Sequence, residues 1–96
     1  MTLPFKEQFA VVTGAGSGIG KETVRVLAER GARGIVLADL NLDSASHVAS
    51  DIAATTGCVC VPCQLDVAQP ASIEAMFRFA IEHFGSLDVL VNGAGI

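Results

Sequence analysis

Basic residues are scarce in this sequence, where six lysines and arginines stand against ten aspartates and glutamates, giving a formal net charge of −4. A nucleic-acid-binding protein would show a basic stripe, so the charge balance argues against that class. There is no run of about eighteen apolar residues, the length that a membrane-spanning helix needs, and the N-terminus lacks the basic and apolar regions of an export signal. We therefore expect a cytoplasmic protein that binds neither nucleic acid nor a membrane.

Cysteine is limited to three residues, Cys58, Cys60 and Cys63, which lie within six positions of one another. A disulfide framework needs pairs spread along the chain, so this odd cluster favours a reducing compartment. The spacing Cys-x-Cys-x-x-Cys could also suggest a metal site. The segment reads as a strand, however, and its alternation would send Cys58 and Cys60 to one face and Cys63 to the other. We interpret all three as ordinary buried thiols.

Apolar residues make up 51% of the 96 positions, enough for one compact domain of modest stability and too many for a disordered chain. Apolar runs predict strands at 9–13, 35–38, 58–67 and 87–91. Helical spacing predicts helices over 18–30, from Asp43 or Ser44 to about 56, and from Pro70 to 84. This alternation predicts an α/β fold, a Rossmann-like doubly wound parallel sheet with strand order 3-2-1-4. A ligand should bind in the crevice between strands 1 and 4, where the order reverses.

A glycine-rich loop joins the first predicted strand to the first predicted helix. Its pattern is Gly-x-x-x-Gly-x-Gly through Gly14, Gly18 and Gly20, and Asp39 follows about twenty positions later, at the tip of the second strand. Glycines there let backbone amides approach a pyrophosphate at the positive end of the helix, and an acidic residue at that distance suits a ribose. The loop could instead serve only as a tight turn, and Asp39 could be a solvated strand end.

Four motifs together resemble the short-chain dehydrogenase/reductase family along essentially the whole chain. They are the glycine loop from Thr13 to Gly20, the acidic tip at Asp39, the segment Leu65-Asp66-Val67, and the strand that ends in Asn92-Gly93-Ala94-Gly95. All four stand in the family's order and at its spacing. The resemblance implies an oxidoreductase that transfers a hydride between a nicotinamide dinucleotide and an alcohol or ketone.

The resemblance implies that the pyrophosphate of the dinucleotide lies against Gly14, Ser17, Gly18, Ile19 and Gly20. Asp39 would accept hydrogen bonds from the adenosine ribose, and its carboxylate would repel the 2′-phosphate of NADP. Leu40 supplies no cation beside it, and Ser17 stands where NADP-using relatives often carry arginine or lysine. NAD is therefore the expected cofactor, with NADP the less favoured alternative.

Two further motifs complete the expected cofactor site. Asp66 and Val67 resemble the pair that lines the adenine pocket, although Asp66 could instead cap the turn before Pro70. The residues that match the family's Asn-Asn-Ala-Gly motif, which stabilises the sheet beside the cofactor, are Asn92, Ala94 and Gly95. Gly93 replaces the second asparagine, and we interpret this as a tolerated variation because the residue stays small.

Tyrosine is absent from the sequence, and Lys6 and Lys21 are its only lysines. The family's proton relay uses a Tyr-x-x-x-Lys helix and a serine on the preceding strand, so no residue here is assigned to catalysis. His47 and His83 fit solvated helix faces. We expect residues 1–96 to be the dinucleotide-binding part of a longer oxidoreductase, inactive alone and lacking the half that binds substrate. The alternatives are a non-catalytic dinucleotide-binding module, a non-functional truncated product, or a subunit completed by an oligomer or a complementing chain.

Overall fold

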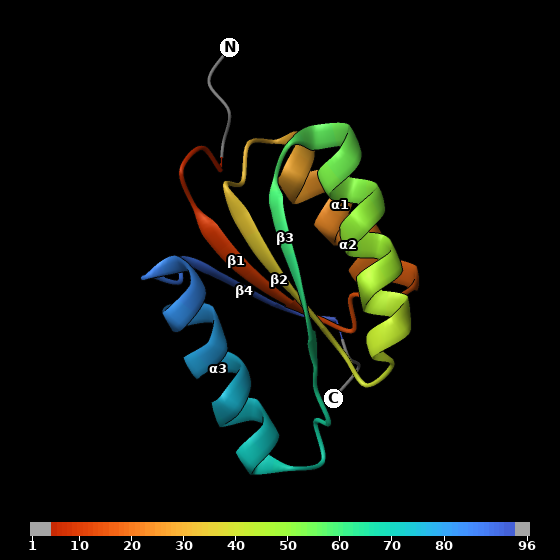
Figure 1. The fold of residues 1–96 in the computed structure, drawn as a ribbon, viewed down its shortest axis with the longest axis vertical. Coiled ribbons are helices and arrows are strands. Elements are labelled where there is room, and N and C mark those ends of the chain that lie inside the picture. Colours follow the sequence, from red (N-terminus) through yellow and green to blue (C-terminus); the bar gives the residue numbers. More distant parts are fainter. Residues whose placement is uncertain (1–4, 94–96) are drawn as a thin grey trace.

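The computed structural model describes residues 5–93 and contains one four-stranded parallel sheet in the order β3-β2-β1-β4. The elements, in chain order, are β1 (Phe9–Thr13), α1 (Gly18–Glu29), β2 (Gly34–Asp39), α2 (Leu42–Thr56), β3 (Val59–Gln64), α3 (Pro70–Phe84) and β4 (Val89–Asn92). Figure 1 shows α1 and α2 against one face of the sheet and α3 against the other. The predicted doubly wound α/β fold and its strand order are confirmed.

The central strand β1 brings the carboxyl ends of three strands together. Thr13, its last residue, pairs with Ala38 of β2 on one side and with Asn92 of β4 on the other. Parallel strands that end level with one another leave their following loops at the same edge of the sheet, which is where open α/β sheets bind ligands. The glycine loop after β1 and the acidic tip of β2 both lie at this edge.

Two hydrophobic cores lie on the two faces of the sheet. The helices α1 and α2 cover the first face with residues that recur at helical spacing. The buried ones are Gly20, Val24, Leu27, Ala28, Ala45, Val48, Ala49 and Ile52. On the second face, α3 buries only Met76 and Ala80 completely, while Ile73, Phe77 and Phe84 are half-buried. The second face is therefore the less completely covered of the two.

The start of α2 differs from its prediction. Asp43 or Ser44 was expected to cap this helix, but the helix begins at Leu42 and its cap is Asn41. The Asn41 side chain accepts a hydrogen bond from the backbone amide of Ser44 at 3.0 Å, so it satisfies a donor that the first turn leaves unpaired. Asp43 and Ser44 lie inside the first turn, and Gly57 ends the helix in the predicted place with a left-handed φ of 76°.

Two of the predicted strands are shorter or shifted. The third ends at Gln64 rather than at residue 67, because the chain turns away from β2 at Asp66, whose carboxylate accepts a hydrogen bond from the Ala68 amide at 3.0 Å. The fourth begins at Val89 rather than at residue 87. Both differences fall at strand ends, where apolar loop residues extend the hydrophobic run beyond the paired segment.

Pro62 lies in the middle of β3, a position that is acceptable only on an edge strand. The Val59 amide donates to the Arg33 carbonyl, which extends the pairing with β2. The backbone N–H and C=O groups of successive strand residues point to opposite sides. Since those of Val59 point toward β2, those of Pro62, three residues later, point away from it. Since proline has no amide hydrogen to donate, the strand order that puts β3 at the end of the sheet accounts for its presence.

The cysteines of β3 and the residue before it divide between the two faces as predicted. Cys58 and Cys60 pack on the α1 and α2 side, and Cys63 packs on the α3 side. Burial raises the pKa of the Cys63 thiol, which favours its neutral form.

Between residues 5 and 93, no helix combines the length and the apolar character needed to cross a membrane.

Candidate functional site

The glycine loop turns sharply between β1 and α1 because two of its glycines adopt left-handed backbone conformations. The φ angle is 67° at Gly14 and 58° at Gly18, values that residues with a side chain rarely adopt. Gly20 is needed for a different reason, because a Cβ there would lie 1.9 Å from the Gly14 carbonyl oxygen. The predicted Gly-x-x-x-Gly-x-Gly pattern thus packs the first turn of α1 directly onto the loop.

The N-terminus of α1 is open to an anion. Ser17 occupies the cap position, but its side chain makes no capping hydrogen bond, and the first turn of α1 contains no acidic residue. A Cβ at Gly18 would meet no atom within 4 Å, so the backbone there is open to approach. Unpaired amides and the positive end of the helix dipole favour negative charge at this position.

Asp39 lies between the glycine loop and the start of α2. One carboxylate oxygen, Oδ2, accepts a hydrogen bond from the Gly16 amide at 2.9 Å, and the other, Oδ1, accepts one from the Asn41 amide at 2.9 Å. The side chain is half-buried. Each oxygen has a second lone pair, so the carboxylate can still accept hydrogen bonds from a ligand. The interpretation of Asp39 as a freely solvated strand end does not fit these contacts.

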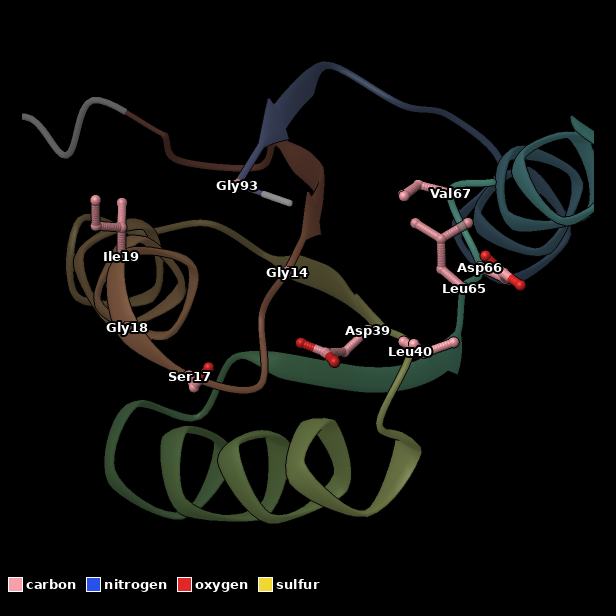
Figure 2. Close-up of a pocket in the computed structure, with 10 residues that line it drawn as sticks. All are labelled: Gly14, Ser17, Gly18, Ile19, Asp39, Leu40, Leu65, Asp66, Val67 and Gly93. Carbon is pink, nitrogen blue, oxygen red and sulfur yellow. The ribbon is translucent and has the colours of Figure 1, made fainter. Parts of the chain in front are cut away.

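A crevice of about 490 Å³ runs along this edge of the sheet. Its lining residues are Gly14, Ser17, Gly18, Ile19, Asp39, Leu40, Leu65, Asp66, Val67 and Gly93. Figure 2 shows the Asp39 carboxylate pointing toward the glycine loop, with Leu65, Asp66 and Val67 on the opposite side. The structure thus brings together residues of all four motifs that sequence reasoning singled out, although the loop, the β2 tip, the segment after β3 and the end of β4 are far apart in the chain.

Not every predicted site residue lines this crevice. Gly20 is buried behind the loop, where it supports Gly14 rather than facing the cavity. Asn92 lines a neighbouring apolar cavity of about 260 Å³, which shares Leu65 and Val67 with the crevice. Ala94 and Gly95 lie outside the described residues.

Asp66 both lines the crevice and stabilises the turn before α3. Its Oδ1 accepts a hydrogen bond from the Ala68 amide, and its own amide donates to the Ser72 hydroxyl oxygen at 3.0 Å. The turn-capping alternative for Asp66 is therefore confirmed as a structural role. That role engages one carboxylate oxygen, so it does not conflict with a ligand contact by the other.

Asn92 and Gly93 tie the end of β4 to the end of β1. The Thr13 hydroxyl donates to the Asn92 side-chain oxygen at 2.9 Å, and the Gly93 amide donates to the Thr13 carbonyl at 3.1 Å. A Cβ at Gly93 would lie 2.7 Å from that carbonyl oxygen. The glycine that departs from the family motif therefore stands at a point of close backbone approach, beside the crevice.

Sequence reasoning assigned no site role to four residues of this region. Leu40, Leu65 and Gly93 line the crevice, and each adjoins a residue that the sequence did single out. Gly16 supports Asp39 through its amide. A signal for the two leucines was available in their positions next to Asp39 and Asp66, whereas Gly16 gave none, because its partner lies 23 positions away.

Comparison with known proteins identifies the chain's relatives. The family model described as short chain dehydrogenase matches residues 8–96. The 7alpha-hydroxysteroid dehydrogenase of Escherichia coli strain K12 is 41% identical over 86 residues, which cover 90% of this chain and 33% of the relative. This relative is thus similar to nearly the whole of the chain.

Two solved structures are similar throughout the fold. The L-sorbose reductase of Gluconobacter frateurii, complexed with NADPH and L-sorbose, has a TM-score of 0.92 and 32% identity over 100% of this chain and 36% of its own. A short-chain dehydrogenase/reductase of Burkholderia phymatum in complex with NAD has a TM-score of 0.84 and 31% identity over 90% of this chain and 30% of its own. The chain spans about a third of the length of these relatives. Since the family model matches nearly every residue from β1 onward, the chain belongs to the short-chain dehydrogenase/reductase family.

Proposed function

We propose that this chain binds a nicotinamide dinucleotide in the crevice at the carboxyl ends of β1, β2 and β4. The observation that carries the proposal is the convergence of the open N-terminus of α1, the Asp39 carboxylate and the segment after β3 on one cavity. The first would hold the pyrophosphate, the second the adenosine ribose and the third the adenine. Similarity to two enzymes solved with NAD and with NADPH supports the same class of ligand.

Within this proposal, the loop residues act through their backbones. Gly14, Gly18 and Gly20 keep the loop close to the helix, and the amides near Ser17 and Ile19 would donate to pyrophosphate oxygens. No acidic side chain in the first turn of α1 opposes the negative charge. The site therefore fits a pyrophosphate in shape and in charge.

The adenosine side of the crevice fits NAD better than NADP. The Asp39 carboxylate would accept hydrogen bonds from the ribose hydroxyls and repel a 2′-phosphate. None of the crevice-lining residues in the described part of the chain is a lysine or arginine that could neutralise such a phosphate. We therefore propose NAD as the preferred cofactor.

The remaining contacts would fix the adenine and the sheet beside it. Leu40 and Leu65 offer apolar surface at the adenine end, and the second oxygen of Asp66 would accept from the exocyclic amine, beside Val67. Asn92 would hold the sheet next to the cofactor through its hydrogen bond with Thr13. Ala94 and Gly95 belong to this proposal through the family motif alone.

In the whole protein, we propose an oxidoreductase that acts on an alcohol or ketone. The bound nicotinamide would accept or donate the hydride, and residues 1–96 would position the dinucleotide for that step. The sequence contains no tyrosine, so none of its residues is proposed as the family's proton-transferring phenol. An oligomer or a complementing chain would then be one source of the missing groups.

Calorimetric titration of the chain with NAD and with NADP tests the proposal. We expect NAD to bind more tightly than NADP, and Asp39→Ala to weaken NAD binding at least about tenfold, because a charge-assisted hydrogen-bond acceptor is lost. Asp43→Ala, which removes an exposed carboxylate in the first turn of α2, is the matched control and should leave the affinity unchanged. An unsubstituted chain that binds neither dinucleotide would contradict the proposal.

A parallel assay with a panel of alcohols tests whether the chain alone can turn over a substrate. We expect binding without turnover, which is also the result that a non-catalytic dinucleotide-binding module would give. Activity that appears only on mixing with a second chain would support a completed subunit. Turnover by the isolated chain would overturn the assignment of the proton relay to residues outside it.

A further inference from the structure

Gly16 lies in the glycine loop but is not explained by the loop's own geometry. Its φ lies outside the positive range that Gly14 and Gly18 adopt, so the left-handed strain that favours glycine at those two positions does not apply to it. It also lies outside the Gly-x-x-x-Gly-x-Gly spacing. The atoms that surround position 16, rather than its own backbone conformation, therefore account for the glycine.

Space is the factor that restricts position 16. A Cβ built there would lie 2.9 Å from Asp39 Oδ2 and 2.8 Å from the Ser44 Cβ, and both separations are shorter than real contacts of this kind. Ser44 belongs to the first turn of α2, next to the fully buried Ala45, so its Cβ is fixed by the packing of the helix. The carboxylate of Asp39 ends a side chain that can rotate.

The Gly16 amide also fixes the direction of that carboxylate. It donates to Oδ2 at 2.9 Å, while the Asn41 amide donates to Oδ1 at 2.9 Å. The two donors come from the glycine loop and from the turn before α2, so the carboxylate is held from both sides. Its orientation in the crevice consequently depends on the loop remaining close enough to reach it.

We infer that Gly16 is a specificity-determining residue of the dinucleotide site, which positions the Asp39 carboxylate for a ribose hydroxyl and against a 2′-phosphate. This inference rests on the proposed function and deepens it. Any side chain at position 16 would push the carboxylate out of its place. The affinity for NAD should then fall while the repulsion of NADP is relieved, so the two cofactors should become less distinguishable.

The experiment uses Gly16→Ala in a Ser44→Gly background, with Ser44→Gly alone as the reference. The background removes the contact with α2 and leaves the contact with Asp39, so a packing defect is separated from an effect on the carboxylate. Calorimetry with NAD and NADP should show the ratio of the two dissociation constants, NADP over NAD, falling at least about fivefold. Thermal unfolding should show that both variants are folded.

A double-mutant cycle identifies the residue through which Gly16 acts. In an Asp39→Ala background, adding Gly16→Ala and Ser44→Gly should change the same ratio by less than about twofold, because the carboxylate is already gone. A full fivefold change in that background would overturn the inference. An unchanged ratio in Gly16→Ala/Ser44→Gly that still binds NAD would also overturn it, and would leave the proposed function intact.

A measurement without ligand covers the case in which Gly16→Ala does not fold. Amide hydrogen exchange followed by NMR should be faster at Gly16 in Asp39→Ala than in the unsubstituted chain, because the acceptor of its hydrogen bond is removed. Equal exchange rates would show that the carboxylate does not hold the loop, and would overturn the inference. Failure of the unsubstituted chain to bind either dinucleotide would overturn the proposed function, and the inference with it.

Discussion

The glycines of the loop are required for separate physical reasons. Gly14 and Gly18 have left-handed backbones, Gly20 packs against the Gly14 carbonyl, and Gly16 leaves room for Asp39. Spacing in the sequence predicted Gly14, Gly18 and Gly20, because the family motif involves neighbours along the chain. It could not predict the role of Gly16, because the contact that restricts Gly16 forms only when β2 lies beside β1.

The structure allows the effects of close packing and of backbone strain to be separated in this loop. Gly20→Ala should destabilise the fold by about 2–3 kcal/mol or more, because its methyl group cannot avoid a backbone oxygen. Gly18→Ala should cost only about 1–2 kcal/mol, the strain of a left-handed alanine, since its methyl group would point into open space.

Urea unfolding of the unsubstituted chain, Gly18→Ala and Gly20→Ala measures these losses of stability. Gly18→Asn is a further control and should lose less stability than Gly18→Ala, because asparagine tolerates the left-handed region better than alanine. Equal losses of stability for Gly18→Ala and Gly20→Ala would show that the close approach of α1 to the loop is not the dominant constraint.

At the scale of single elements, the bodies of the helices and strands were predictable and their ends were not. The buried stripes of α1 and α2 follow directly from the 3.6-residue period. The start of α2 was mispredicted because Asn41, Asp43 and Ser44 are all good capping residues within four positions. Which of them caps is decided by where β2 ends, since Asn41 is also the residue whose amide reaches Asp39.

The capping assignment can be tested by comparing two of these candidates. Asn41→Ala should lower the free energy of unfolding by about 1 kcal/mol, because the Ser44 amide loses its acceptor. Ser44→Ala should change it by less than about 0.5 kcal/mol, because the hydrogen bond uses the Ser44 backbone and not its hydroxyl.

Denaturant unfolding monitored by circular dichroism measures both values. Asn41→Ala keeps the backbone amide that donates to Asp39, so NAD affinity should be preserved in the same variant. A larger loss of stability for Ser44→Ala than for Asn41→Ala would favour Ser44, one of the two residues predicted from the sequence, as the cap.

For the molecule as a whole, the sequence predicted the topology because strand–helix alternation restricts the possible connections strongly. The structure also contains an incompletely covered apolar surface beside β4. Leu90 of that strand is 50% exposed and lines the apolar cavity next to α3, together with Ile73 and Phe77. The size and position of this surface could not be predicted from the sequence, because they depend on how α3 packs against the sheet.

An apolar surface of this kind should cause self-association of the chain at micromolar concentration. Leu90→Lys should shift the population toward the monomer, because burying the ammonium group in an apolar contact is unfavourable. Ile81→Lys is a matched control, since Ile81 is 47% exposed but does not line that cavity.

Sedimentation velocity over a range of concentrations measures the effect. Association that persists unchanged in Leu90→Lys, or is lost equally in Ile81→Lys, would show that another surface mediates it. A dispersed monomer of the unsubstituted chain would count against an accessible core face.

The proline in β3 has a consequence for how copies of this sheet can join. Pro62 removes an outward donor from the middle of one edge strand, while β4 at the other edge contains no proline. Polymers built by edge-to-edge pairing need two usable edges on every molecule. Pairing of one β4 with another would close as a twofold dimer, and an assembly that used this edge alone would not continue into a fibre.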